Sequence, residues 1–210
     1  MADPYQQIPE DKRDKVLQAA IKEFARCGYE RASTNQIIQE ANISKGLLFH
    51  YFKNKKNLFL ATLDYCFNLL LNHMQPYMEE MSADFFERLL ELGKAKMKMF
   101  LDHPLEYRIL MIAFADAPAE IAEEIKQRYE QTEAISYSFM LRGIDHSKFR
   151  PEIDQEKAIQ LVMLSLEAMR NQWLQRFQVN EDKGLSQFDD ALQEMEQMVE
   201  ILKYGVYRRE

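Results

Sequence analysis

The stretch from Ser44 to Phe52, SKGLLFHYF, combines side chains that could bind nucleic acid with side chains that belong in a hydrophobic core. Lys45 and His50 can carry positive charge and donate hydrogen bonds. A buried helix rarely contains lysine, and a solvated helix rarely contains so many large apolar groups. A short helix that packs on its neighbours along one face and meets DNA along the other needs both kinds of side chain.

Helical spacing divides this stretch into two faces. Leu48 and Phe52 fall on the face that would pack inward, whereas Lys45, Leu47 and His50 fall on the opposite face. On the outer face, the lysine could donate to guanine O6 and N7, and the leucine could touch a thymine methyl group. The spacing therefore predicts one face for the core and one for the major groove.

The residues around this stretch predict two short helices joined by a tight turn. Ser33 and Gln36 have the spacing of a capping box at a helix start. Asn42 suits the turn because asparagine tolerates positive φ, and Ser44 can cap the helix that follows. Gly46, near the start of that helix, would let another backbone approach closely. Together these signals indicate a helix-turn-helix.

The composition predicts an all-α protein. The 210 residues include only five valines and three threonines, whereas strong helix formers such as Leu, Met, Ala, Glu and Lys are abundant. The N-terminus has no apolar signal-peptide core, and the longest apolar run, 109–115, is too short to cross a bilayer, so we expect a cytoplasmic protein without membrane contact. The expected helices cover residues 11–26, 33–42, 45–51, 55–73, 84–102, 104–116, 118–142, 155–177 and 186–207.

Charge is distributed unevenly along the chain. Residues 1–60 contain ten basic and seven acidic side chains, so this part carries +3, while the remainder carries −10. The local sign of the charge matters more for DNA binding than the overall net charge of −7. The distribution indicates a mildly basic N-terminal module followed by an acidic body.

The run from Ser33 to Phe59, STNQIIQEANISKGLLFHYFKNKKNLF, resembles the DNA-binding domain of the TetR family of transcriptional regulators. The resemblance implies a three-helix helix-turn-helix domain over residues 1–55 and a larger helical ligand-binding and dimerisation domain over residues 56–210. The helix that begins at residue 55 would link the two domains. The implied function is that of a homodimeric regulator that binds double-stranded DNA at a palindromic operator, most often a repressor released by a small-molecule effector.

The resemblance also assigns DNA contacts to individual side chains. Thr34 and Ser44 at helix starts, Tyr51, and Lys55 at the start of the fourth helix are expected to donate hydrogen bonds to phosphates. Asn35 is a candidate for a base or phosphate contact. With the outer face of the recognition helix, the expected DNA-binding residues are Thr34, Asn35, Ser44, Lys45, Gly46, Leu47, His50, Tyr51 and Lys55.

Three residues depart from the family pattern. Asn42 stands where the turn commonly has glycine, Leu47 stands where a small or hydroxylated residue is common, and Phe49 replaces a common tyrosine. The last two changes remove polar contacts. The base preference of relatives therefore does not transfer to this chain.

The last two long helices are expected to form a homodimeric four-helix bundle, as the resemblance implies. The segment 155–177 is apolar on more than one face, which is typical of a helix buried on both sides. The alternative is that these residues fill the core of a monomer. The expected interface residues are Leu161, Leu164, Leu192, Met195, Val199 and Leu202.

A cavity in the body would bind a small, largely apolar effector. Twelve methionines suggest an adaptable apolar interior, and pockets usually contain few polar anchors. Glu167 and Arg170 could anchor a charged group, but an ion pair within the helix or between subunits is the competing interpretation. The candidate lining residues are Met99, Tyr107, Met111, Phe114, Tyr137, Met163, Glu167, Arg170 and Trp173.

The sequence carries no signature of an enzyme. Its four histidines are scattered, it has no phosphate-binding glycine loop or GxSxG motif, and neither a metal nor a cofactor is expected. Cys27 and Cys66 are interpreted as buried reduced thiols, with redox sensing as the alternative. We therefore predict a DNA-binding regulator. The alternative is a dimeric helical interaction protein whose main partner is another protein.

Overall fold

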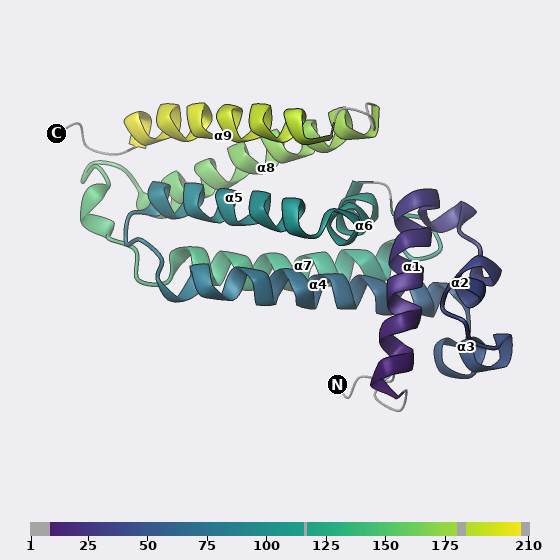
Figure 1. Ribbon diagram of the computed structural model, residues 1–210. Helices are drawn as coiled ribbons and strands as arrows, with labels where there is room; N and C mark the ends of the chain where they lie inside the picture. The colour runs from purple at the N-terminus through teal and green to yellow at the C-terminus, as the bar shows by residue number, and fades with distance from the viewer. Residues whose placement is uncertain (1–8, 116, 180–183, 207–210) are drawn as a thin grey trace. The chain divides into compact units, whose positions relative to one another are not determined.

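The computed structural model describes residues 9–115, 117–179 and 184–206 (Figure 1). These residues form nine α-helices and one short 3-10 helix, which confirms the all-α prediction. The chain divides into two compact units, one with residues up to 72 together with 102–130, the other with 73–101 and the chain from 131 onward. The helices are α1 Glu10–Arg31, α2 Thr34–Glu40, α3 Lys45–Phe52, α4 Lys55–Glu79, α5 Phe85–Asp102, α6 Pro104–Ala115, α7 Ala122–Leu141, η1 His146–Lys148, α8 Gln155–Val179 and α9 Gly184–Val206.

Side-chain caps start α2, α3 and α4 at the predicted positions. The hydroxyls of Ser33 and Ser44 accept hydrogen bonds from backbone N–H groups three residues later, at 3.4 and 3.2 Å. Asn54 Oδ1 accepts the corresponding bond at 2.8 Å. Asn42, in the turn between α2 and α3, has the expected positive φ of 50°. The helix-turn-helix therefore follows from local signals that the sequence displays.

The core of the first unit joins α1, α2, α3 and α4 through buried apolar side chains. The rings of Phe24 and Phe59 are 4.9 Å apart and nearly perpendicular, and the ring of Tyr29 lies 5.2 Å from that of Phe59. Ile37 of α2 and Leu48 of α3 are fully buried. Aromatic pairs with this edge-to-face geometry stabilise a core beyond the area they bury.

Two helices run further than the periodicity predicts. An end of α1 is predicted near residue 26, but the helix resumes after a kink at Gly28, where φ is 70° and ψ is 174°, and continues to Arg31. An end of α4 is predicted near residue 73, but α4 continues through Pro76 to Glu79. A proline removes a backbone donor and kinks a helix without always ending it.

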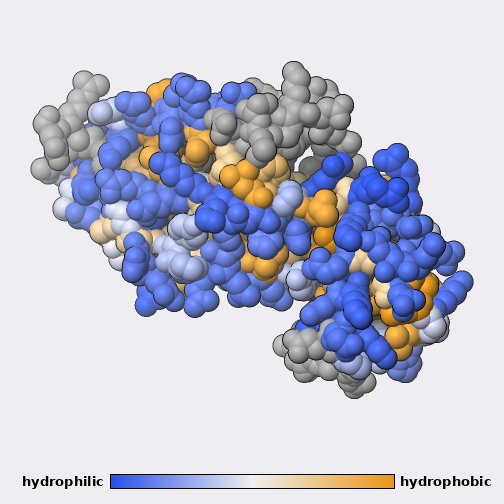
Figure 2. Space-filling view, in the orientation of Figure 1, coloured by the Kyte–Doolittle hydropathy of each residue, from blue (hydrophilic) through white to orange (hydrophobic). Residues whose placement is uncertain are grey.

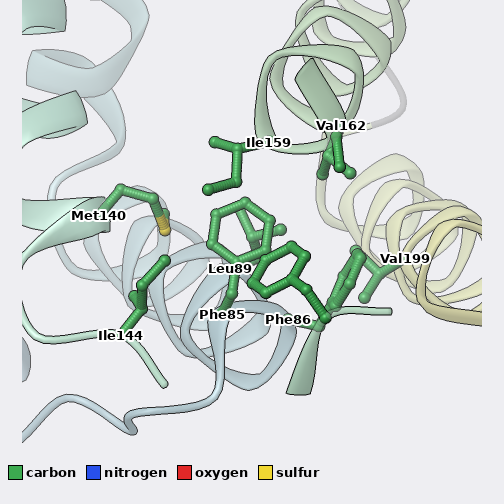
Figure 3. Packing of buried hydrophobic residues seen from close by; sticks show 10 residues of the cluster. Phe85, Phe86, Leu89, Met140, Ile144, Ile159, Val162 and Val199 are labelled. Carbon is green, nitrogen blue, oxygen red and sulfur yellow. The ribbon is translucent and has the colours of Figure 1, made fainter. Parts of the chain in front are cut away.

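The second unit is built around a cluster of buried apolar side chains (Figure 3). Phe85 and Phe86, at the start of α5, pack edge to face with their ring centroids 5.3 Å apart. Val162 of α8 and Val199 of α9 belong to the same cluster, so both helices contribute to the core of the unit. The buried members are Phe85, Phe86, Leu89, Met140, Ile144, Phe149, Ala158, Ile159, Val162 and Val199.

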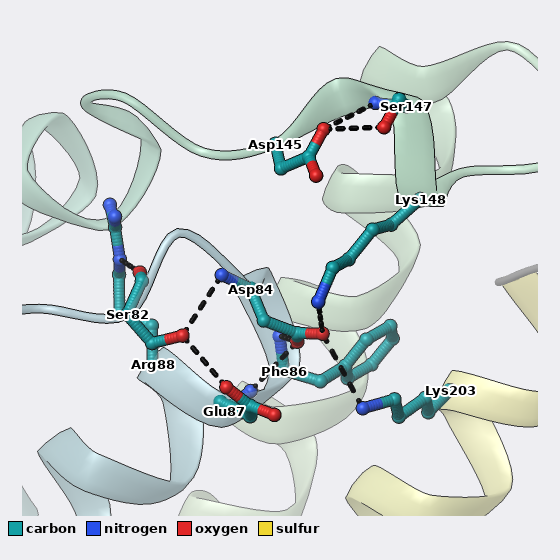
Figure 4. A network of polar contacts seen from close by, with 9 residues as sticks. All are labelled: Ser82, Asp84, Phe86, Glu87, Arg88, Asp145, Ser147, Lys148 and Lys203. Atoms are coloured by element: carbon teal, nitrogen blue, oxygen red, sulfur yellow. Dashed lines mark hydrogen bonds and ion pairs between the residues drawn. The ribbon is translucent and has the colours of Figure 1, made fainter.

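A buried carboxylate holds the start of α5 in this unit (Figure 4). Asp84 is 3% exposed, and its Oδ1 accepts hydrogen bonds from the backbone N–H groups of Phe86 and Glu87 at 2.9 and 3.0 Å. Its Oδ2 lies 2.7 Å from Lys148 Nζ and 3.5 Å from Lys203 Nζ. Burial raises the pKa of Asp84, but the Lys148 and Glu87 hydrogen bonds and the charges of both lysines lower it overall.

A buried guanidinium connects the same region to the end of α7. Arg88 is 3% exposed and donates from Nη1 to the carbonyl oxygens of Phe139, Met140 and Arg142 and from Nε to that of Ser82. The last carbonyl groups of a helix have no partner within the helix. Arg88 supplies donors to them, so the beginning of α5 and the end of α7 stabilise each other.

Replacement of Asp84 by asparagine should destabilise the protein by about 1–3 kcal/mol at pH 7. The amide oxygen can still cap the helix, but the neutral side chain no longer forms the ion pairs with Lys148 and Lys203. The folded-state pKa of Asp84 is depressed, so its contribution is present above the ordinary aspartate pKa of about 3.9 and lost as pH falls through the folded-state pKa. Urea denaturation followed by circular dichroism from pH 7 to pH 3 should therefore show the two proteins converging in acid.

Asp154→Asn provides a matched control. Asp154 also caps a helix, accepting from the Lys157 backbone N–H at 3.2 Å, but its ion pair with Lys157 is exposed. Its replacement should change the free energy of unfolding by less than about 0.5 kcal/mol. An equal loss in both variants, or an Asp84→Asn deficit independent of pH, would contradict the assigned role.

Candidate nucleic-acid interface

The recognition helix α3 has the two faces that the sequence predicts. Leu48 and Phe52 are each 1% exposed and belong to the core. Lys45 and His50 are exposed, and Leu47 is half-buried. The helix is therefore anchored along one side, and its opposite side presents a cation, an imidazole and the apolar side chain of Leu47.

Positive charge surrounds this exposed side. Between residues 41 and 63 the chain has four lysines and no acidic residue, and Lys45 and Lys53 are exposed. Apolar side chains are visible among the hydrophilic ones around α2 and α3 (Figure 2). A surface that combines basic and apolar groups suits the phosphates and base edges of DNA.

Aromatic rings lie beside the outer side chains of α3. The Lys45 ammonium lies 6.0 Å from the centroid of the half-buried Phe49 ring. The ring of Tyr51 packs edge to face against the exposed ring of His50, with 5.0 Å between centroids. Phe49 lacks the hydroxyl that is common at its position, but its ring restricts where the lysine can point.

Gly46 has no role in the internal packing of the first unit. A Cβ atom built on Gly46 would meet nothing within 4 Å, and Gly46 is not at positive φ. Neither sterics nor backbone conformation within the chain therefore requires glycine in this helix. Glycine at this position leaves room for the close approach of a second molecule, and its contact with DNA stays a prediction.

The flanking residues lie at the expected helix starts, with one difference. Thr34 is half-exposed, Asn35 and Ser44 are exposed, and Tyr51 is half-buried. Lys55 points back to the end of α1: its Nζ donates to the Glu30 carbonyl oxygen at 2.9 Å and lies 5.1 Å from the centroid of the Tyr29 ring. An ammonium has three donors, so this bond uses one of them. The phosphate contact of Lys55 stays a prediction.

The link between α3 and α4 has a strained geometry that the sequence did not predict. Lys53 has φ 65° and ψ −49°, and the Asn54 N–H donates to the Phe52 carbonyl oxygen at 2.7 Å. This is a γ-turn in which a non-glycine residue adopts a rarely populated conformation. Lys53 Nζ also donates to the His50 carbonyl oxygen at 2.6 Å, so the turn closes the end of the recognition helix.

A buried acid that sequence reasoning missed positions α2. Glu23 of α1 is 4% exposed, accepts the Ser33 N–H at 2.9 Å and pairs with Arg26. Burial raises its pKa, but the Ser33 and Arg26 hydrogen bonds lower it overall. The available signal was its position: Glu23 lies three residues after Ala20 and seven after Val16, on the apolar face of its helix.

The first unit also fastens α1 and α4 to the start of α7. Lys56 Nζ donates to the Glu120 carbonyl oxygen at 3.0 Å and pairs with the Glu124 carboxylate. The hydroxyl of Tyr29 donates to the Glu120 carboxylate at 2.9 Å, and burial together with this carboxylate raises the pKa of Tyr29 to about 12. Further along α4, the Asp64 carboxylate accepts two hydrogen bonds from the guanidinium of Arg128, at 2.6 and 2.9 Å.

The nine candidate ligand residues fall on both units. In the first unit, Tyr107 and Met111 are half-buried, and the Phe114 ring contacts the rings of Phe67 and Tyr129. In the second unit, Met99 is fully buried, Met163 packs against the core cluster and Tyr137 is exposed. Glu167 and Arg170 form an ion pair of 3.3 Å within α8. The side chain of Trp173 lies outside the described residues, and the ligand-binding role of all nine stays a prediction.

The six candidate dimer residues differ in how exposed their side chains are. Leu161 and Leu164 are each 55% exposed. Val199 is 2% exposed, and Met195 and Leu202 pack against the same core cluster, because this stripe of α9 faces the interior of its own unit. Leu192 is half-buried. Among the side chains of α9 that the structure describes, the large apolar ones that are exposed are instead Ile201 and Tyr204, which the sequence pattern did not indicate.

Two family models match this chain. Residues 16–62 match the model of bacterial regulatory proteins of the tetR family, and residues 81–207 match the tetracyclin repressor-like C-terminal domain. The chain belongs to the TetR family. Both matches agree with the resemblance of the helix-turn-helix run and extend it to the helical body.

Several characterised or solved proteins are similar to this TetR-family chain. The biofilm operon icaADBC negative transcriptional regulator IcaR of Staphylococcus epidermidis is 27% identical over 177 residues, covering 81% of this chain and 89% of IcaR. Two regulators named FadR share its fold, and the one from Bacillus halodurans is described as a fatty acid degradation regulator. The Bacillus halodurans structure has a TM-score of 0.69 at 18% identity, covering 93% and 96% of the two chains. The Bacillus subtilis structure, solved in complex with stearoyl-CoA, has a TM-score of 0.63 at 15% identity, covering 92% and 99%.

The TetR-family relatives are DNA-binding transcriptional regulators rather than enzymes, and this chain is a regulator of the same kind. Within the described ranges, no group of three or more histidine, cysteine, aspartate or glutamate side chains could hold a metal ion. None of the described helices has the apolar length needed to span a bilayer. Cys66 is fully buried, and burial raises the pKa of its thiol, which disfavours the reactive thiolate.

Replacement of Gly46 by alanine should separate folding from DNA binding. Alanine is the better helix former by about 1 kcal/mol, and the added methyl group meets no atom of the chain, so the melting temperature should rise. DNA affinity should fall if the backbone of α3 approaches DNA at Gly46, as the resemblance predicts, because the methyl group would stand in the way. Thermal unfolding and fluorescence anisotropy with an operator fragment measure the two effects.

Gly93→Ala is the control, because there the added methyl group would clash inside the chain. A Cβ atom at Gly93, in α5, would lie 2.1 Å from Met195 Cε, so the methionine has to move. Its effect should be confined to stability. If Gly46→Ala leaves operator affinity unchanged while raising the melting temperature, α3 does not approach DNA at Gly46.

Proposed function

We propose that this regulator binds a palindromic operator as a homodimer and represses transcription until a small, largely apolar effector releases it. The observation that carries the proposal is the construction of α3, with Leu48 and Phe52 buried and Lys45, Gly46 and His50 on the opposite, exposed side. Such a helix is anchored and has an outer face whose chemistry matches the major groove. Action on DNA implies that the protein works in the cytoplasm.

Each exposed side chain has a specific part in this proposal. Lys45 donates to guanine O6 or N7, and Leu47 contacts a thymine methyl group. Thr34 and Ser44 at helix starts, together with the Tyr51 hydroxyl, contact phosphates and set the register of α3. Asn35, His50 and one of the remaining donors of Lys55 complete the interface. The DNA-binding domain in this proposal spans residues 1–55, and α4 connects it to the body.

A dimer supplies the second recognition helix that a palindrome requires. Half-sites on one face of B-DNA are about 34–36 Å apart, a spacing that two copies of α3 must match. The exposed apolar side chains of α8 and α9, Leu161, Leu164, Ile201 and Tyr204, form the proposed interface. Single exposed leucines are common, but four large apolar residues on two adjacent helices are typical of an interface.

The effector half of the proposal rests on the relatives and on the composition. IcaR is named a negative regulator, which supports repression as the direction of the effect. The FadR of Bacillus subtilis binds stearoyl-CoA, which makes long-chain acyl compounds the first candidates to screen. The effector would favour a body conformation in which the half-site spacing no longer fits the operator, shifting the population away from the DNA-bound state.

The alternative function is that of a helical dimer whose main partner is another protein. Its discriminating feature is the salt dependence of binding, since contacts with phosphates release counterions and make affinity fall steeply with salt. To distinguish the two functions, the protein is incubated with randomised double-stranded DNA at moderate salt, and the retained sequences are determined. An inverted repeat supports the regulator, whereas retention without a shared sequence supports the alternative.

Lys45→Ala should weaken binding to the recovered operator by about tenfold or more and relax base preference at one position of each half-site. The measurement is fluorescence anisotropy on the operator and on single-base variants. Lys126→Ala, which removes an exposed lysine of α7 paired with Glu130, should leave affinity and preference unchanged. Unchanged base preference in Lys45→Ala would remove the lysine from base recognition.

Leu161→Glu combined with Leu164→Glu should convert the dimer to a monomer, because the charges would enter an apolar interface. Both side chains are more than half exposed within the chain, so the fold should survive. Light scattering after size exclusion gives the mass, and circular dichroism reports the fold. Leu101→Glu, at a 51% exposed site on α5, is the control, and a double variant that stays dimeric would refute the interface.

A further inference from the structure

Lys55, at the start of α4, is held on the end of α1 by two contacts. Its Nζ donates to the Glu30 carbonyl oxygen at 2.9 Å and lies 5.1 Å from the centroid of the Tyr29 ring. The last carbonyl groups of a helix lack partners within the helix and form the negative end of its dipole, so an ammonium is stabilised there. A cation within about 6 Å of an aromatic ring is attracted by the ring as well. Both contacts direct this long side chain to one place.

The ring of Tyr29 is fixed in the core of the first unit. Tyr29 is 5% exposed, and its ring centroid lies 5.2 Å from that of Phe59 and 6.5 Å from that of Phe24. Aromatic rings packed in this way against each other have little freedom to move. The surface that attracts Lys55 is therefore rigid.

The hydroxyl of Tyr29 joins this ring to a carboxylate 91 positions further along the chain. It donates to the Glu120 carboxylate at 2.9 Å. Burial and this carboxylate raise the pKa of Tyr29 to about 12, so the phenol keeps its proton and continues to donate at physiological pH. Donation to a charged acceptor polarises the phenol and makes the face of its ring more negative, which strengthens the attraction for a cation. Glu120 thus acts on Lys55 through the phenol.

Lys56 holds the backbone of Glu120 in reach of Tyr29. Its Nζ donates to the Glu120 carbonyl oxygen at 3.0 Å and also pairs with the Glu124 carboxylate. The Glu120 side chain is exposed, so the packing of the unit does not require it. Because the Lys56 bond goes to the backbone, a change of the Glu120 side chain leaves that bond in place.

We propose that Glu120 is a positioning residue for DNA binding: through the hydroxyl and ring of Tyr29 it holds the Lys55 ammonium at the end of α1, with a remaining donor available to a phosphate. A free lysine side chain loses conformational freedom when it binds a phosphate, whereas one that is already held loses less. The inference rests on the proposed phosphate contact of Lys55 and adds to the DNA-binding apparatus a residue from the segment just before α7.

Removal of the Glu120 carboxylate tests the proposal by the sign of its effect. An acid repels the phosphates of DNA, so its loss should by general electrostatics strengthen binding. Glu120→Ala should instead weaken binding by about two- to tenfold, which is the cost of ordering one long side chain. Tyr29→Phe, which removes only the hydroxyl, should act in the same direction. Fluorescence anisotropy on the recovered operator and on a duplex of random sequence measures both variants, since a phosphate contact affects all sequences alike.

Glu124→Ala is the matched control. It removes the same charge four residues later, from the partner of Lys56, and leaves the bond between Tyr29 and Glu120 in place. Its DNA affinity should be unchanged or slightly higher. Thermal melts followed by circular dichroism establish that each variant is folded at the temperature of the titration. An equal loss of affinity in Glu124→Ala, or an unchanged or higher affinity in Glu120→Ala, would overturn the proposal.

A double-mutant cycle with Lys55→Met shows whether the effect passes through the lysine. Methionine is unbranched but uncharged, so Lys55→Met should weaken binding and lower the slope of log affinity against log salt by about one contact. In that background Glu120→Ala should have no further effect, whereas a purely structural role would weaken binding equally in both backgrounds and refute the positioning role. Unchanged affinity in Lys55→Met would instead refute the phosphate contact of Lys55, on which the inference rests.

Discussion

The helix-turn-helix depends on one buried carboxylate. Glu23 lies inside α1 and accepts the backbone N–H of Ser33, the residue that caps α2. The start of a helix has N–H groups without intrahelical partners, and here two of them are satisfied from different sources, one by Glu23 and one by the Ser33 hydroxyl. This fixes where α2 begins, and the turn at Asn42 and the cap at Ser44 then place α3. The residues on the outer face of α3 can therefore change without disturbing its orientation, because Glu23 and the two serine caps set that orientation.

In the second unit, buried charged side chains likewise form hydrogen bonds with backbone groups at helix ends, both at the start of α5 and at the end of α7. Arg88 donates to carbonyl groups at the end of α7, and Asp84 accepts from N–H groups at the start of α5. Both charges are buried, and most of their partners are backbone groups rather than an opposite charge. Charged groups that satisfy helix ends join elements through directional bonds, which apolar packing alone does not supply.

Most of the first unit could be predicted because its signals are local. The caps at Ser33 and Ser44 and the turn at Asn42 involve neighbours within a few residues. The bond from Lys55 to the Glu30 carbonyl joins residues 25 positions apart, and no local pattern contains it. Periodicity found an apolar stripe on α9, but it could not tell that Val199 serves the interior of its own unit while Ile201 is exposed. The ligand residues divide between two units, so chain order gave no guide to their grouping.

The contacts of Tyr29 and Lys56 with the start of α7 make the DNA-reading module discontinuous along the chain. Residues 102–130 are connected to α1 and α4 by Glu120, Glu124 and Arg128. A graft of residues 1–55 onto another body would carry the whole recognition helix but would leave Tyr29 without Glu120. New operator preferences therefore arise more readily by substitution on the outer face of α3 than by recombination of whole domains. Where domains are exchanged, residues 102–130 have to be transferred together with the helix-turn-helix domain.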